Sequence, residues 1–155
     1  MSALIFDSLC RGNIRIVKCL LTQAGIEIDP EDEQRSTPLS LAATFDNPNS
    51  VKLLLKNGAD VTKLDNQGQN VLHKAAREGN SRIVELVIDH LKKDDATLNT
   101  LMRQKDARGN TPFMLAVQSV TSGKTLKTFI EKAHSSQYIN SPNRRNEYPM
   151  HKACR

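Results

Sequence analysis

The chain has 155 residues, with 22 Lys and Arg against 17 Asp and Glu, a formal net charge of +5. Hydrophobic residues make up 38% and aromatic residues 4%, with no Trp, which favours packed aliphatic helices over one aromatic-rich core. No apolar run approaches the roughly 18 residues of a membrane span, so the sequence predicts no direct membrane insertion.

The cysteines indicate a reducing compartment. Cys10, Cys19 and Cys154 are odd in number, lack metal-ligand spacing and fall on expected helices, so we expect buried thiols. The N-terminus also lacks the basic region and long apolar core of a signal peptide. The predicted location is intracellular, in the cytoplasm or the nucleus.

In chain order, the first expected helix pair lies within residues 3–36, with a break at Gly12-Asn13. A connecting segment follows over residues 25–36. Arg35 stands where its turn would be expected to carry glycine, so we expect this turn to be less regular than the later ones.

The second pair opens at Thr37, which can cap a helix, and Pro38 fits the first helical turn. Asp46-Asn47 takes the place of the Gly-Asn break. The segment 57–69 then begins with a Gly58 helix cap and ends in a tight turn that carries Gly68.

The third pair covers residues 70–91, with helices expected over about 71–78 and from about 81. Gly79-Asn80 separates the two helices. The second helix carries more apolar surface than an isolated pair can bury, so a neighbouring pair must cover it. The residues concerned are Ile83, Val84, Leu86, Val87, Ile88 and Leu91.

The next Thr-Pro opening, at Thr111, comes 41 residues after Asn70, so residues 92–104 should hold an insertion. Asp94 or Asp95 can cap a short helix there. In the fourth pair we expect a second helix over about 125–134, with its apolar side chains inward. These are Leu126, Phe129 and Ile130.

The Thr37-Pro-Leu opening, the Leu72-His73 and Ala75 positions and the turn glycine Gly68 resemble the ankyrin repeat, whose period is 33 residues. This resemblance implies an all-α solenoid of stacked helix-turn-helix units joined by β-hairpin-like fingers. One domain would span residues 1–155, and its last unit would stop inside its first helix, as in a fragment of a longer array. The expected units are about 3–36, 37–69, 70–110 with its insertion near 92–104, 111–147 and a partial unit 148–155.

Two features invite a chemical interpretation. His73 and His151 could bind metal or act in acid–base catalysis, but the resemblance implies structural histidines that tie one unit to the next. Residues 119–125 look like the tail of a phosphate-binding loop, yet Gln118 replaces its leading glycine and a helix, not a strand, precedes it. We therefore predict no catalytic residue, cofactor or metal site.

Side chains on an aligned row of fingers and on the first helices remain as candidates for binding. The fingertips are Glu33-Gln34, Asn66-Gln67, Ala107-Arg108 and Arg144-Arg145, so the row should run from acidic to basic. Phe45 and Leu64 are apolar where the repeat usually carries polar residues. They are candidate anchors, and the alternative is that they fold back onto a finger.

The resemblance implies a non-catalytic module that binds another protein through the fingers and the concave helix face. We expect a monomer without a small-molecule substrate. One alternative is a regulatory or tethering segment of a larger channel, enzyme or transcription regulator, and the other is a nucleic-acid binder. The predicted contact residues are Phe45, Leu64, Asn66, Lys74, Arg77, Glu78, Arg108, Arg144 and Arg145.

Overall fold

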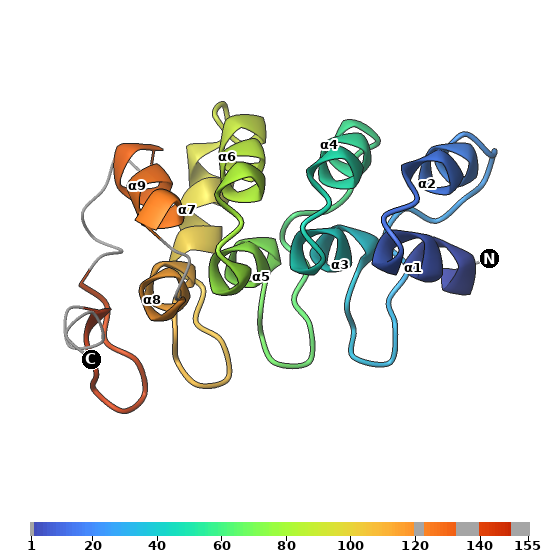
Figure 1. Cartoon of the computed structure of the whole chain (residues 1–155). Helices are drawn as coiled ribbons and strands as arrows, with labels where there is room; N and C mark the ends of the chain where they lie inside the picture. The colour runs from blue at the N-terminus through green and yellow to red at the C-terminus, as the bar shows by residue number, and fades with distance from the viewer. Residues whose placement is uncertain (1, 120–122, 133–139, 150–155) are drawn as a thin grey trace.

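The structure is a computed structural model that describes residues 2–119, 123–132 and 140–149, and these form an elongated stack of helices (Figure 1). The described residues contain nine helices and no β-strand. The expected all-α stack of helix pairs is therefore confirmed. Within the described ranges, no helix combines the length and apolar character that crossing a bilayer requires.

The helices lie in two rows, and the connecting loops project from one side as a single file of fingers (Figure 1). Each helix in a row contacts the next helix of that row. The inner row, nearer the fingers, contains α1 (Ser2–Cys10), α3 (Pro38–Thr44), α5 (Val71–Glu78) and α8 (Pro112–Gln118). The outer row contains α2 (Ile14–Leu21), α4 (Pro48–Lys56), α6 (Ser81–His90) and α9 (Gly123–Lys132).

The inner helices begin where polar side chains satisfy their free backbone N–H groups. The Thr37 hydroxyl accepts a 3.3 Å hydrogen bond from the Ser40 backbone N–H, and the Thr37 N–H donates back to the Ser40 hydroxyl at 3.0 Å. Asn70 and His73 make the same reciprocal arrangement at the start of α5. These capping boxes fix where α3 and α5 start.

In the second and third pairs, a left-handed residue separates the two helices and lets the next side chain reach the preceding unit. Gly79 has φ 76°, and Asp46 takes the same conformation with φ 52°. The amide of Asn80 then donates to the Ala43 carbonyl at 2.9 Å, and that of Asn47 donates to the Leu9 carbonyl at 2.8 Å. Each of these two breaks therefore also links two units.

The insertion forms α7 (Asp95–Arg103), as expected. Asp94 caps it, accepting a 3.1 Å hydrogen bond from the Thr97 backbone N–H. Leu101 and Met102 are buried, and the Leu101 carbonyl accepts a 2.9 Å hydrogen bond from the Asn70 side chain. Helix α7 is thus anchored to the start of α5.

Three sequence-based expectations about side chains and turns are wrong. Ile130 is 58% exposed, because only Phe129 and partly Leu126 of the three α9 side chains face the core. Cys10 and Cys19 are exposed free thiols, since they lie on the solvent sides of α1 and α2. The third expectation concerns the turn at Arg35 and is corrected with the fingers below.

Candidate functional site

The four fingertips share one turn geometry. In each, a leading Asp or Asn side-chain oxygen accepts two backbone N–H groups, at 2.7–3.0 Å. A left-handed residue completes each turn, and Arg35, with φ 59°, does so in the first finger. That turn is therefore as regular as the others. The leading residues are Asp32, Asp65, Asp106 and Asn143.

Main-chain hydrogen bonds hold the fingers in register. Asn66 N–H donates to the Gln34 carbonyl at 2.9 Å, and Ala107 N–H donates to the Gln67 carbonyl at 2.8 Å. Arg144 N–H donates to the Arg108 carbonyl at 3.3 Å. Each bond runs from the residue after the leading Asp or Asn of one finger to the residue two after the leading Asp of the preceding finger, so the tips stand in a fixed file.

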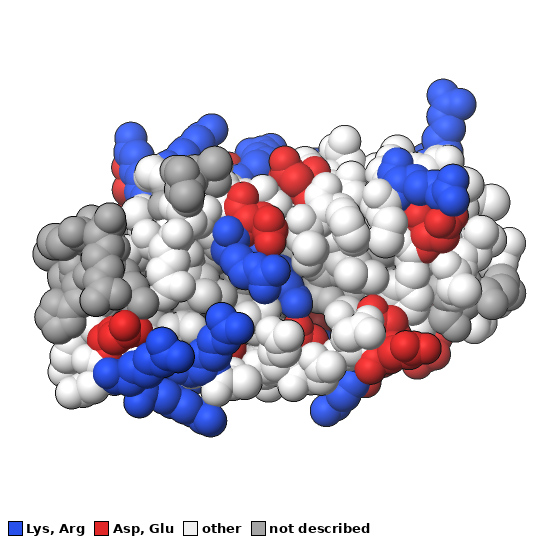
Figure 2. Space-filling view, turned by 60° about the horizontal axis from the view of Figure 1, so that its bottom comes forward, with Lys and Arg blue, Asp and Glu red and all other residues white. Residues whose placement is uncertain are grey.

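The charge of this file changes sign along the stack. Acidic side chains gather near the first finger, and basic side chains gather over the last two (Figure 2). At the acidic end, Lys63 pairs with Glu31 at 3.1 Å across the first two fingers. Hydrogen bonds from Lys63 and then Arg35 lower the pKa of the Glu31 carboxyl below its usual value. At the basic end, Arg108, Arg144 and Arg145 are all exposed.

The two apolar candidate anchors, Phe45 and Leu64, differ in their exposure to solvent. Phe45 ends α3 and is 47% exposed, so its ring is open to solvent. Leu64 is half-buried on the second finger. Phe45 therefore offers the larger accessible apolar surface of the two.

The charged candidate residues on α5 also differ in how exposed their side chains are. The Lys74 ammonium lies 2.6 Å from the buried Asp65 carboxylate, and its side chain is only 17% exposed. Arg77 is 55% exposed and pairs with Glu78 at 3.4 Å. Lys74 thus stabilises the second finger, whereas Arg77, Glu78 and Asn66 are exposed.

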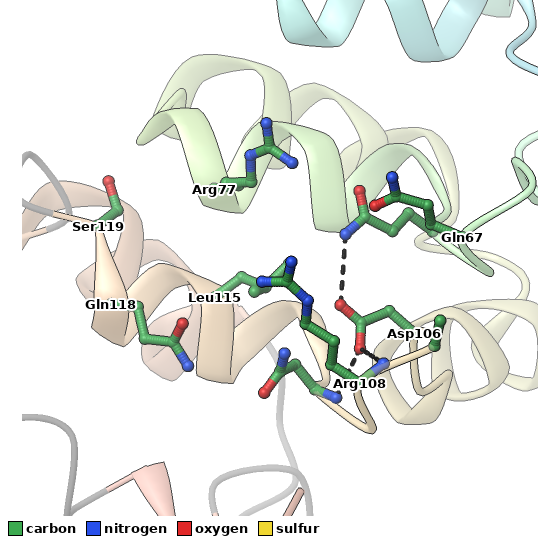
Figure 3. Close-up of a pocket in the computed structure, with 10 residues that line it drawn as sticks. Gln67, Arg77, Asp106, Arg108, Leu115, Gln118 and Ser119 are labelled. Atoms are coloured by element: carbon green, nitrogen blue, oxygen red, sulfur yellow. Dashed lines mark hydrogen bonds between the residues drawn. The ribbon is translucent and has the colours of Figure 1, made fainter. Parts of the chain in front are cut away.

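Two adjoining hollows open between the inner helices and the last fingers. The first hollow, of about 530 Å³, lies between the second and third fingers under α5 and α8 (Figure 3). The second hollow, of about 430 Å³, lies between the third and fourth fingers. Both are lined by Arg108, Asn110 and Gln118, so one arginine borders both.

The floor of the first hollow is a buried carboxylate. One oxygen of Asp106 accepts the backbone N–H groups of Arg108 and Asn110, and the other accepts the Gln69 side-chain amide at 3.3 Å (Figure 3). Sequence reasoning missed Gln69, Asp106 and Asn110 as lining residues. The only signal was Leu115, which stands where the preceding unit has Lys74.

His73 is structural. It is fully buried, its Nδ1 accepts the Asn70 backbone N–H at 3.2 Å, and its Nε2 lies 3.1 Å from the Asn110 carbonyl. Since a carbonyl only accepts, Nε2 donates its proton in this contact. Burial lowers the pKa of His73 to about 4, against hydrogen bonding to Asn110 that raises it. The ring ties the third unit to the fourth.

The apparent phosphate-loop segment also has a structural explanation where it is described. Thr125 is buried, and its hydroxyl donates to the Gly79 carbonyl at 2.8 Å. This bond joins α9 to the break before α6. His151, Cys154 and most of the partial fifth unit lie outside the described residues. Within the described ranges, no group of three or more His, Cys, Asp or Glu could hold a metal ion.

Comparison with known proteins shows the same repeat. Residues 4–100 match the family model described as ankyrin repeats in three copies. Phosphocholine transferase AnkX of Legionella pneumophila is 34% identical over 110 residues, which cover 68% of this chain and 11% of that protein. Inversin of Homo sapiens is 34% identical over 91 residues, which cover 59% of this chain and 8% of that protein.

A third relative matches a shorter part of the chain. The p105 subunit of nuclear factor NF-kappa-B of Gallus gallus is 42% identical over 65 residues, covering 42% of this chain and 7% of that protein. The chain therefore spans 11% or less of the length of these three relatives.

Proposed function

Because this chain belongs to the ankyrin-repeat family, whose members generally act in protein–protein interaction, we propose that it is a non-catalytic module that binds another protein. Its contacts would lie on the finger row and the concave face beside it. The observation that carries the proposal is the register of the fingers, which hydrogen bonds of 2.8–3.3 Å fix. A pre-ordered row loses little conformational entropy on binding, which favours affinity.

The proposed anchors are Phe45 and Leu64, and charged neighbours would orient the partner. Exposed aromatic side chains are over-represented among residues that dominate binding energy. The change from acidic to basic fingers would steer a partner whose charge runs in the opposite sense. The proposed orienting residues are Asn66, Arg77, Glu78, Arg108, Arg144 and Arg145, with Lys74 acting through the second finger.

The test is a double variant, Phe45→Ala with Leu64→Ala, assayed against a partner captured from cell extract and then purified. Since the Phe45 ring is exposed and Leu64 half-buried, the variant should keep its fold by circular dichroism. We expect binding weaker by at least about tenfold.

The matched control is Ile130→Ala, which removes an exposed aliphatic side chain from α9 in the outer row. It should leave affinity unchanged. If the double variant binds as tightly as the parent chain, Phe45 and Leu64 are not anchors.

A second possibility is that the same surface contacts another part of a longer protein, as a regulatory or tethering segment. The observation in its favour is that the relatives are many times longer than the matched region. In a longer chain, hydrogen exchange should then slow at the fingers and α5 without any added partner. Exchange equal to that of these 155 residues alone would reject the intramolecular contact.

We propose no catalysis, cofactor or small-molecule substrate for this chain, a monomeric state, and an intracellular location. The transferase activity in the name of AnkX belongs to that protein, of which 11% is matched. The exposed free thiols of Cys10 and Cys19 support a reducing compartment. Nucleic acid is disfavoured because the first finger is acidic and only two Tyr are present.

A further inference from the structure

Given that the chain binds a protein, we propose that the two hollows around Arg108 receive an acidic, extended segment of the partner. A carboxylate would lie between Arg77 and Arg108 in the first hollow, and the following acidic residue would face Arg144 and Arg145 in the second. This deepens the proposed function by assigning the chemistry of the bound segment and its place in the array.

Two guanidinium groups converge on the first hollow. Arg77 reaches it from α5 and Arg108 reaches it from the third finger, over Leu115 (Figure 3). Among the ion pairs of the described residues, Arg77 has only the 3.4 Å contact to Glu78, and none includes Arg108. Like charges that face one hollow favour an anion between them, and guanidinium groups bind carboxylates with two parallel hydrogen bonds.

The preceding unit explains why this hollow is open. There, the Lys74 ammonium crosses to the Asp65 carboxylate at 2.6 Å. In the next unit Leu115 replaces that lysine, so no ammonium group reaches Asp106, and the side chain that crosses to it is the neutral amide of Gln69. The substitution leaves room for a ligand group beneath the two arginines.

The acidic residues of the hollows are turned toward the protein itself. One Asp106 oxygen accepts hydrogen bonds from Arg108 and Asn110, and the other accepts one from Gln69. A Glu147 oxygen accepts the Asn143 side-chain amide at 2.7 Å. The arginine side chains, by contrast, are exposed, so the open side of the hollows presents positive charge (Figure 2).

The amide groups that line the hollows suit an extended main chain. Gln67 and Gln118 border the first hollow, and Asn110 and Gln118 border the second. Side-chain amides both donate and accept, so they can pair with the N–H and carbonyl groups of a passing segment. A short acidic peptide fits better than a long polyanion, because the acidic first finger repels an extension in that direction.

The experiment is a titration of the whole chain with a short, end-blocked peptide of alternating Glu and Gly, followed by nuclear magnetic resonance. We expect shifts of the Nε–H signals of Arg77 and Arg108 and of the backbone amides near Gln118. Raising the ionic strength should weaken binding, because exposed charge pairs are screened. Arg108→Gln should raise the dissociation constant about fivefold.

The matched control is Arg15→Gln, which removes the same charge from an exposed site on α2 and should leave the constant unchanged. Equal weakening by both variants would overturn the site and leave only net charge. Equal or tighter binding of a Lys-Gly peptide, or of single-stranded DNA with the same Arg108 dependence, would overturn the ligand class.

Absence of acidic-peptide binding at low salt would also overturn this inference. It would leave the proposed function standing if a captured partner still depends on Phe45 and Leu64. The two proposals can therefore fail separately.

Discussion

His73 shows how one buried side chain makes the stability of this array depend on pH. Its ring is neutral because burial lowers its pKa to about 4, from an ordinary value of 6.5. In the unfolded chain the ring takes up a proton as the pH falls through 6.5, whereas the folded chain resists this until about pH 4. Acidification between these values therefore favours unfolding.

We expect the free energy of unfolding to fall by about 2 kcal/mol between pH 7 and pH 5 from this residue alone. His73→Met should remove most of that fall, because unit four carries buried Met114 at the same place. The variant should lose about 2 kcal/mol at pH 7, since the Asn70 N–H and Asn110 carbonyl lose their partner. Urea unfolding at both pH values would measure this, and an unchanged pH slope would contradict it.

Sequence reasoning could predict the structural role of His73, since the repeat pattern places it at a fixed position. It could not predict that Lys74 is held by Asp65, because that contact depends on how the finger folds back onto α5. It also placed Cys10 and Cys19 inside when both are exposed. A short amphipathic helix does not reveal which flank its neighbour covers.

At the scale of elements, the fingers depend on glycines that serve two different purposes. Gly58 has φ 85° and open space around it, so only its backbone conformation requires glycine. Gly109 has φ 81°, and a Cβ there would lie 2.5 Å from the Arg144 backbone nitrogen. Gly109 therefore also permits the close approach of the third and fourth fingers.

Gly58 and Gly109 allow a controlled comparison of these two purposes. Gly58→Ala should cost about 1 kcal/mol of unfolding free energy through its left-handed conformation. Gly109→Ala should cost about 1 kcal/mol more, because the fourth finger must move away and the Arg144-to-Arg108 hydrogen bond is lost. Denaturant unfolding gives both values, and hydrogen exchange should speed up at residues 143–147 only in Gly109→Ala. Equal costs would mean that the finger contact contributes nothing.

Helix positions were predictable because their ends carry strong local signals, such as Thr37, Asn70 and Asp94. The regular turn at Arg35 was not, since a non-glycine residue at φ 59° is tolerated only when the surrounding hydrogen bonds hold it there. The two hollows could not be predicted from the sequence either. They depend on the spacing of neighbouring fingers and on the direction of the Arg108 side chain.

At the scale of the whole molecule, contacts between units run mainly from each helix pair to the next. Helix α3 contacts α1 and α5, and α6 contacts α4 and α9. Hydrogen bonds from Asn47, Asn80 and Thr125 repeat this pattern of nearest-neighbour links. The repeat period in the sequence predicted this architecture, because a helix pair with exposed apolar surface needs a copy beside it.

If stability comes from contacts between neighbouring units, a destabilising core substitution near one end should loosen only the units at that end. The same substitution in a middle unit should loosen the units on both sides of it. Val17 in α2 and Val87 in α6 are both fully buried in the outer row. Replacing either with Ala should cost about 2 kcal/mol. Val17→Ala should speed hydrogen exchange in α1 and α2 while α5 and α6 keep their protection, because α2 packs only on α1 and α4 among the principal helix contacts.

Val87→Ala should instead speed exchange in α4, α5, α6 and α9 together, since α6 packs against the other three helices. Mass spectrometry of exchanged peptides resolves these segments. If both variants sped exchange uniformly along the chain, the units would unfold as one cooperative block. The register of the finger row would then depend on the whole fold. If the change in exchange is local instead, each pair of neighbouring units is sufficient to align its two fingers.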